Sequence, residues 1–376
     1  MNAARRLIGE IRVTCDGGVQ RVTAEVSGNP VWFESSAVDL APSVEAFATA
    51  FLIPSLHQGI QLQVDQEVDR EWMENIGRLL PILTKWWEYP SLAPLAPVKD
   101  QQGLSTRPQT ALCFTGGVDS FHSLLRGGIK PRLLVYIHGY DIPLEDETRF
   151  AALKASFDVV AAAVNALPIL VRSNLRQHVF FNACGWERTH GAALAAVGHL
   201  LSSEVSHFVI SSTLVRSDER PWGSHCLTDP LWSSARLRIE QSGEDVWRHD
   251  KLRAIIDEPL VREHLRVCWE NRRPTGNCSH CDKCLFTMIV LAQARKVDRF
   301  PVFEINDCPA VGRELATRIK RLPRTVYLRS YAILLNEGLD QNLSIAIKRL
   351  LDRSSSRPSG LQRFLPSRWR SRAAYL

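Results

Sequence analysis

The sequence TALCFTGGVDS spans residues 110–120 and decides the predicted fold. It opens with the apolar run ALCF, whose length is typical of a buried strand. Gly116 and Gly117 follow, and a helical pattern then continues to Gly127 and Gly128, which are typical of a helix C-terminus. This stretch therefore predicts a strand, a glycine-rich turn and a helix in direct succession.

Apolar runs and helical patterns alternate over the next hundred residues. Runs typical of strands lie at 133–137, 168–171 and 208–211, and helical patterns lie at 145–166 and 187–203. Such alternation predicts an α/β fold, in which helices cover both faces of a parallel sheet. Ligands of these sheets bind at the carboxyl ends of the strands. Four loops should therefore converge on one pocket, and they begin near Thr115, His138, Arg172 and Ser212.

Composition divides the chain into four parts. The first part predicts a hairpin around Gly17 and helices near 43–53 and 69–86. Four prolines between 89 and 109 indicate a linker, so a domain boundary is expected there. The predicted parts are a small α+β accessory domain at 1–98, an α/β domain at 110–300, a helical extension at 310–352 and a basic, poorly ordered tail at 353–376.

The overall composition is that of a globular protein. Hydrophobic residues make up 45% and charged residues 23% of the 376 residues. No run of about 18 apolar residues occurs, and the start lacks the apolar segment of a secretory signal, so we expect a cytoplasmic protein that does not enter the membrane. Nine cysteines without a signal argue against a disulfide framework.

Six arginines beyond residue 352, where no acidic residue occurs, equal the whole net charge of +6. They predict a solvated tail or, alternatively, contact with nucleic acid or a membrane surface.

The glycine-rich turn has the residues that a phosphate site needs. Paired glycines let the backbone approach phosphate oxygens, and their N–H groups form a positive nest with the start of the helix. The hydroxyl groups of Thr115 and Ser120 would add donors, whereas Asp119 would hold magnesium or orient the loop. Neither the P-loop NTPase motif nor a dinucleotide-binding glycine motif is present at this strand. A chance Gly-Gly turn that opens a helix is the alternative.

A second motif, CSHCDKC, spans residues 278–284, and Cys268 lies ten residues before it. Four thiolates suit a tetrahedral structural zinc site, and C-x-x-C spacing lets a short turn present two sulfur atoms to one ion. The last cysteine begins a predicted helix at 284–296, whose dipole favours a thiolate. An iron–sulfur cluster is an alternative occupant, and His280 is an alternative to Cys268 as fourth ligand.

The sequence TGGVDS resembles the S-G-G-x-D-S loop of the PP-loop ATP pyrophosphatases, with threonine in place of the usual first serine. With the later cysteine motif, the chain is similar to the 7-cyano-7-deazaguanine synthases of that superfamily over about residues 110–290. The resemblance implies an adenine nucleotide alpha hydrolase-like fold, ATP and Mg²⁺ at the loop, and a structural Zn²⁺ ion. The implied ATP-binding residues are Phe114, Thr115, Gly116, Gly117, Val118, Asp119 and Ser120, of which Asp119 and Ser120 would be catalytic. The implied zinc ligands are Cys268, Cys278, Cys281 and Cys284.

The resemblance also implies a reaction. Enzymes of this type hold pyrophosphate while a substrate oxygen attacks the α-phosphorus of ATP, and a nitrogen nucleophile then displaces AMP. This implies a C–N ligase for a small carboxylate or a modified base, with an ammonia donor; a homodimer would fit the family. The run YIHGYD (136–141) departs from the Asp-Tyr-Gly-Gln-like run of the family, so the acceptor stays open and could be a macromolecule. A tRNA sulfur-transfer enzyme and a non-catalytic nucleotide-binding subunit are the alternative functions.

Polar and aromatic residues that follow the predicted strands are the candidates for substrate contact. They are His138, Ser212, Arg216, Trp222 and Asp229. His138 could act as a base, and the stretch from Trp222 to Trp232 could grip a planar or anionic substrate. The alternative for each is a structural role, such as capping or anchoring a loop.

Overall fold

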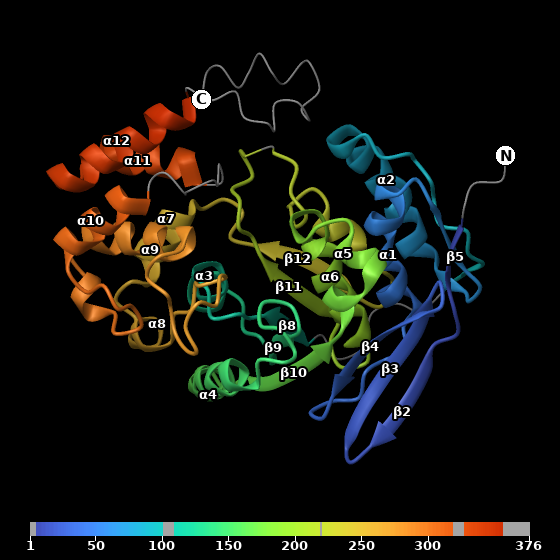
Figure 1. Ribbon diagram of the computed structural model, residues 1–376. Coiled ribbons are helices and arrows are strands. Elements are labelled where there is room, and N and C mark those ends of the chain that lie inside the picture. Colours follow the sequence, from blue (N-terminus) through green and yellow to red (C-terminus); the bar gives the residue numbers. More distant parts are fainter. Residues whose placement is uncertain (1–4, 101–108, 219, 319–326, 356–376) are drawn as a thin grey trace. The chain divides into compact units, whose positions relative to one another are not determined.

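The computed structural model describes residues 5–100, 109–218, 220–318 and 327–355 (Figure 1). The chain forms two compact units, which divide between Val246 and Trp247. We call them the sheet unit and the cysteine unit, after the feature that each contains. The predicted basic tail lies outside the described residues from position 356 onward.

Five parallel strands form one half of the sheet. They are β8 (Thr110–Cys113), β9 (Leu133–His138), β10 (Leu167–Ser173), β11 (His207–Ser211) and β12 (Arg238–Ser242). Their spatial order is β12-β11-β8-β9-β10, and every neighbouring pair is parallel. β9 and β10 follow β8 on one side of the sheet, and the chain then crosses back so that β11 and β12 lie on the other side of β8. This is the order of a doubly wound sheet, and its switch point lies between β8 and β11.

Helices cover both faces of this parallel half. The helices are α3 (Val118–Arg126), α4 (Glu147–Ala163), α5 (Val179–Asn182) and α6 (Trp186–Leu200). On one face, Phe114 and Tyr136 pack against Phe157 of α4. On the other, Cys113 and Val135 belong to the hydrophobic core that includes the alanine-rich α6. The predicted α/β fold with a mostly parallel, helix-flanked sheet is therefore confirmed.

Strands from the N-terminal segment extend the same sheet. They are β1 (Arg5–Ile8), β2 (Arg12–Asp16), β3 (Val19–Val26), β4 (Asn29–Ser35) and β5 (Gln61–Val64). β4 pairs antiparallel with β10, with Phe33 opposite Ser173, so that ten strands form one sheet. β4 thereby covers the edge that β10 would otherwise expose. Residues 1–98 were expected as a separate domain, but strands from their described part share a sheet with the parallel strands. The compact units divide near residue 246 instead.

The other N-terminal elements are α1 (Val44–His57), β6 (Val68–Asp69), α2 (Arg70–Trp87) and β7 (Val98–Lys99). α1 packs against α6, and its residues Val44–Leu56 are all buried, which explains why apolar residues occur all around this helix. The helices predicted near 43–53 and 69–86 correspond to α1 and α2. The predicted hairpin corresponds to β2 and β3.

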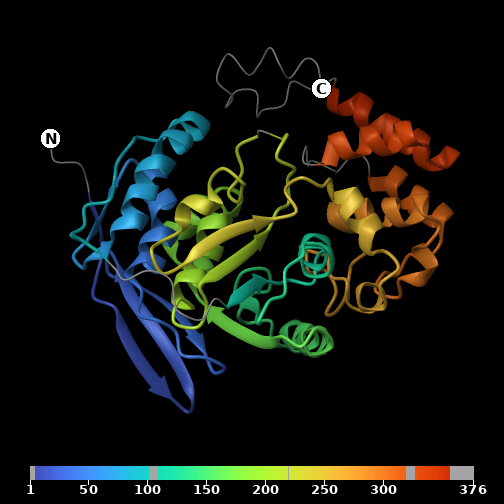
Figure 2. The same cartoon turned by 180° about the vertical axis from the view of Figure 1, so that it is seen from behind.

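Helices make up most of the described cysteine unit (Figure 2). They are α7 (Arg248–Ile255), α8 (Pro259–His264), α9 (Asp282–Gln293), α10 (Cys308–Arg318), α11 (Leu328–Glu337) and α12 (Gln341–Ser355). α9 is the central helix, and its Phe286 stacks on Tyr327 with 4.5 Å between ring centroids. The predicted helical extension therefore belongs to the same unit as the cysteine motif. None of the helices in the described chain combines the length and apolarity that crossing a bilayer requires.

Candidate functional site

The glycine-rich turn lies at the switch point of the sheet. It follows the carboxyl end of β8, whose neighbour on the returning side is β11. Gly116 has a φ of 74°, in the left-handed region that favours glycine, and Gly117 is the N-cap of α3. As a glycine, this N-cap residue has no side chain that could accept a hydrogen bond from the first N–H groups of the helix. The first N–H groups of α3 and the helix dipole can therefore receive an anion there.

Asp119 and Ser120 lie in the first turn of α3, and both are buried. The Ser120 hydroxyl donates a hydrogen bond of 3.1 Å to the carbonyl oxygen of Gly117, which holds the turn in shape. A carboxylate in the first turn is favoured by the helix dipole. Thr115 is partly exposed at the start of the turn. These residues give the turn N–H groups, hydroxyl groups and one carboxylate within a single short stretch of chain.

Phe114 and Val118 belong to the predicted loop but point into the core. Phe114 lies edge-on to Phe121 with ring centroids 5.0 Å apart, and Val118 is buried. The Phe114 side chain thereby holds the start of the turn against Phe121 of α3. Any contact that they make with a ligand would therefore come from backbone groups.

Two buried polar atoms lie at the carboxyl ends of the strands that flank β8. Within the described part of the chain, neither Ser211 Oγ at the end of β11 nor His138 Nδ1 at the end of β9 has a hydrogen-bond partner. Both strands neighbour β8 in the sheet, so each of these strand ends has a polar atom that could still accept or donate a hydrogen bond.

His138 holds the loop that follows β9. Its Nε2 donates to the carbonyl oxygen of Pro143 over 3.0 Å, and its ring stacks on Phe150 with centroids 3.9 Å apart. Burial lowers the pKa of His138, so that the ring is neutral at pH 7. Nδ1 is then an unprotonated acceptor. The structure thus gives His138 a loop-capping contact, one of the two roles expected from its sequence position.

The first two candidates after β11 interact with their own chain. The buried Ser212 hydroxyl donates to the carbonyl oxygen of Leu214 over 2.7 Å. Arg216 is exposed and pairs with Glu244 at 2.8 Å and with Asp245 at 3.3 Å. Both contacts shape the turn beside β12.

Asp229 is the centre of a buried hydrogen-bond network in the following loop. It accepts hydrogen bonds from Ser224 Oγ at 2.6 Å, Gln241 Nε2 at 2.6 Å and the His225 N–H at 3.2 Å. Burial raises the pKa of this carboxyl to about 6, although the hydrogen bonds partly oppose the shift. Trp222 lies edge-on to His190 of α6, with centroids 5.7 Å apart. The structure therefore uses Asp229 to anchor the loop.

Gly191 allows this loop to lie directly on α6. Its N–H donates to the carbonyl oxygen of Gly223 over 3.2 Å. A Cβ at Gly191 would lie 2.1 Å from that oxygen and 2.8 Å from Asp229 Oδ1. Sequence reasoning missed this position because a glycine inside a helical pattern gives no sign of its partner.

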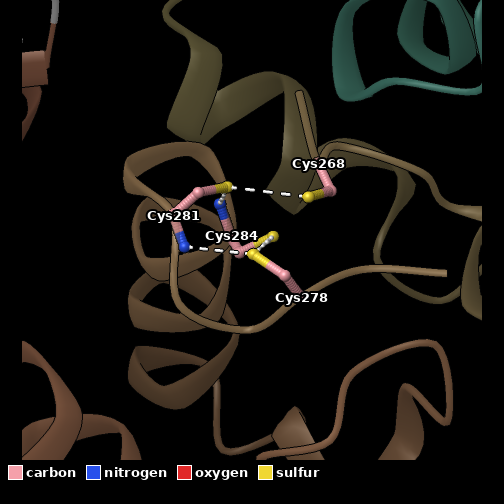
Figure 3. A group of neighbouring side chains, drawn as sticks. All are labelled: Cys268, Cys278, Cys281 and Cys284. Carbon is pink, nitrogen blue, oxygen red and sulfur yellow. Dashed lines mark hydrogen bonds between the residues drawn. The ribbon is translucent and has the colours of Figure 1, made fainter. Parts of the chain in front are cut away.

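Four cysteine sulfur atoms lie together in the cysteine unit (Figure 3). Cys268, Cys278 and Cys281 come from the chain before α9, and Cys284 lies in its first turn. All four are buried, and their sulfur atoms lie within 4.8 Å of one another. The Cys278–Cys284 and Cys268–Cys281 sulfur pairs are 3.9 Å and 4.0 Å apart. The predicted four-cysteine set is thus brought together.

The spacing fits one tetrahedral ion. A Zn–S bond of about 2.3 Å gives tetrahedral S–S edges of about 3.8 Å, close to these two separations. Backbone N–H groups of Cys281 and Cys284 donate to the sulfur atoms of Cys278 and Cys281, which stabilises thiolate charge. Without an ion, the hydrogen bond to Cys268 raises the pKa of the Cys284 thiol. The four sulfur atoms are too close together for all of them to be thiolates without a cation. A divalent cation would compensate their negative charge, so the cluster could hold a metal such as zinc.

Asn277 positions the cluster and was not expected from the sequence. Its Oδ1 accepts the N–H groups of Val267 and Cys268 at 2.8 Å and 3.1 Å, and its Nδ2 donates to the carbonyl oxygens of Leu265 and Val302. This buried amide ties the distant ligand Cys268 to the CSHCDKC loop. A neighbouring side chain, His280, instead lies 2.8 Å from Glu314 Oε1 and is outside the sulfur cluster.

Comparisons with protein-family models, with curated proteins and with solved structures find no match to this chain. The fold and the site alone thus describe the class of this protein. It is a doubly wound α/β protein with a glycine-rich turn at its switch point and a four-cysteine cluster.

Proposed function

We propose that the protein binds Mg²⁺-ATP at residues 114–120 and transfers AMP to an oxygen of a carboxylate acceptor. The observation that carries the proposal is the position of the glycine-rich turn at the switch point between β8 and β11. Doubly wound sheets bind their ligands there. The left-handed Gly116 and the glycine N-cap of α3 offer the backbone N–H groups that a pyrophosphate group requires.

The reaction follows from what the turn offers. Backbone N–H groups at the start of α3 hold the β- and γ-phosphates, and the Ser120 hydroxyl keeps the turn in shape. Asp119 holds the magnesium ion that accompanies the nucleotide. An acceptor carboxylate oxygen attacks the α-phosphorus, the bond to the β-phosphate oxygen breaks, and pyrophosphate leaves. A nitrogen nucleophile then attacks the acyl carbon, and the C–O bond to AMP breaks. The protein contributes positioning and charge stabilisation.

We assign the four-cysteine cluster to a structural zinc ion. Four thiolates close the coordination sphere, so the ion would stabilise the fold and leave no open position for a substrate. The sulfur separations support a single ion, because thiolates of an iron–sulfur cluster bind separate iron atoms and must spread around its core.

Product analysis tests the proposed reaction. Purified protein is incubated with Mg²⁺, α-labelled ATP, ammonia and a panel of carboxylates that includes 7-carboxy-7-deazaguanine. We expect AMP and pyrophosphate to appear with one acceptor, and Asp119→Ala to abolish them. The exposed Asp245→Ala is the matched control and should retain activity. ADP and phosphate as products would refute adenylation. ATP binding without turnover across the panel would favour a macromolecular acceptor or a non-catalytic nucleotide-binding subunit.

A further inference from the structure

Strand β2 is an exposed edge of the sheet unit. All five of its residues, Arg12–Asp16, are exposed, and among the described residues the strand pairs only with β3. Figure 1 shows β2 at the margin of the sheet, on the outer side of the hairpin. Such an edge presents unpaired backbone groups to any strand that can match it.

The hairpin geometry decides which backbone groups of β2 face outward. Its two turn residues, Gly17 and Gly18, have φ angles of 54° and 78°, as in a type I′ turn. The flanking pair Asp16–Val19 is then a hydrogen-bonded pair, and such pairs alternate along an antiparallel ladder. Thr14 and Arg12 therefore direct their backbone groups toward β3. Val13 and Cys15 direct theirs toward the free edge.

The sequence of β2 is complementary to itself. When two copies pair antiparallel about Thr14, Val13 of one copy lies opposite Cys15 of the other, and both have outward N–H and C=O groups to exchange. In the same register, Arg12 lies opposite Asp16, so both ends of the strand pair opposite charges. Shifting the centre to Val13 or to Cys15 separates Arg12 from Asp16. Among these three registers, only the one centred on Thr14 both pairs Arg12 with Asp16 and lets the outward N–H and C=O groups form hydrogen bonds.

We propose that β2 is a homodimer interface, at which a second copy of this chain pairs antiparallel about Thr14. The contact is isologous, because each strand contributes the same residues to both halves of a two-fold interface. It joins two ten-stranded sheets into one continuous sheet. One five-residue strand makes a smaller interface than those of obligate dimers, so the dimer forms reversibly as the protein concentration rises. This inference is independent of the proposed nucleotide site.

A cysteine on the two-fold axis tests the register. Opposite residues of a non-hydrogen-bonded pair have Cα atoms about 4.5 Å apart, within the range of a disulfide. We expect Thr14→Cys, made in a Cys15→Ser background, to give a covalent dimer on mild oxidation that a reducing agent reverses. Val13→Cys in the same background is the matched control. Its two copies are offset along the strands beyond bridging distance, so this variant should form no covalent dimer. Equal cross-linking of both variants would overturn the proposed register.

Charge reversal tests the interface without cross-linking. Sedimentation equilibrium of the wild-type chain should show a monomer–dimer equilibrium. Asp16→Arg should weaken it at least tenfold, and the double variant Arg12→Asp/Asp16→Arg should restore it. A wild-type protein that stays monomeric at high concentration would overturn the proposal. So would a dimer that Asp16→Arg leaves unchanged, because its contact must then lie on another surface.

Discussion

For a single residue, Asp229, the sequence and the structure indicate different roles. Sequence position made it a candidate for substrate contact, as it did Ser212 and Arg216. The structure gives all three side chains partners within the chain. Those partners include Gln241 and Glu244, which lie 12 and 28 residues further along the chain in another strand and its loop, so local sequence could not indicate them. The glycine-rich turn and the four cysteines could be predicted because their chemistry depends on short spacings.

The buried carboxyl of Asp229 predicts a pH dependence of stability. Its pKa is raised from 3.8 to about 6, so the folded state binds the proton more tightly than the unfolded state does. The tighter binding of this proton stabilises the folded state. The stabilisation is complete below the pKa of Asp229 in the unfolded chain, and it is lost as the pH rises through the pKa of Asp229 in the folded chain. The shift corresponds to about 3 kcal/mol, at 1.36 kcal/mol per pKa unit.

The free energy of unfolding of the wild-type chain and of Asp229→Asn, measured by denaturant titration from pH 4 to 8, isolates this effect. The wild-type value minus the variant value should fall by up to about 3 kcal/mol between pH 4 and 7 and then stay constant. A difference that does not change with pH would contradict a buried, proton-binding Asp229.

At the scale of elements, close packing of α6 against the loop at 222–229 predicts that Gly191 tolerates no side chain. A Cβ in Gly191→Ala would clash with a backbone oxygen that cannot move freely. We expect a loss of about 1–3 kcal/mol in the free energy of unfolding. Gly77→Ala in α2 is the control, because nothing lies within 4 Å of the position that a Cβ would take there. It should gain about 0.5–1 kcal/mol from helix propensity. Equal effects of the two changes would show that the loop does not pack on α6 in this way.

Strand prediction from sequence succeeded where burial on both faces produced apolar runs. β8, β9, β10 and β11 match such runs. β12, with the sequence RIEQS, has a mixed pattern because it is the edge of the parallel half, and it was not expected. The pairing of β4 with β10 was missed as well, because it joins segments far apart in the chain and leaves no local signal.

At the scale of the whole molecule, the division into two units predicts that metal removal acts locally. The four cysteines lie in the cysteine unit, and the ten-stranded sheet lies in the sheet unit. We expect the purified protein to contain about one zinc ion per chain, since four thiolates form one closed site. A strong chelator should release it and expose the buried amides around the cluster, because structural zinc supplies folding free energy.

Hydrogen exchange measured by mass spectrometry can follow this loss by segment. Exchange should rise between residues 265 and 304 after chelation, whereas β8, β9 and β11 should keep their protection. Protection that is lost equally from both units would contradict independent stabilisation. A protein that contains no metal would contradict the assignment of the cluster to zinc.

The central claim is that the turn before α3 binds the phosphates of ATP, and calorimetric titration with Mg²⁺-ATP tests it most directly. Gly116 and Gly128 flank α3, and both have left-handed φ angles, of 74° and 69°. Alanine at either position meets the same backbone strain, but only Gly116 belongs to the proposed site. We predict that the wild-type chain and Gly128→Ala bind Mg²⁺-ATP alike and that Gly116→Ala binds at least tenfold more weakly. Absence of binding to the wild-type chain, or equal affinity of the two variants, would contradict the claim.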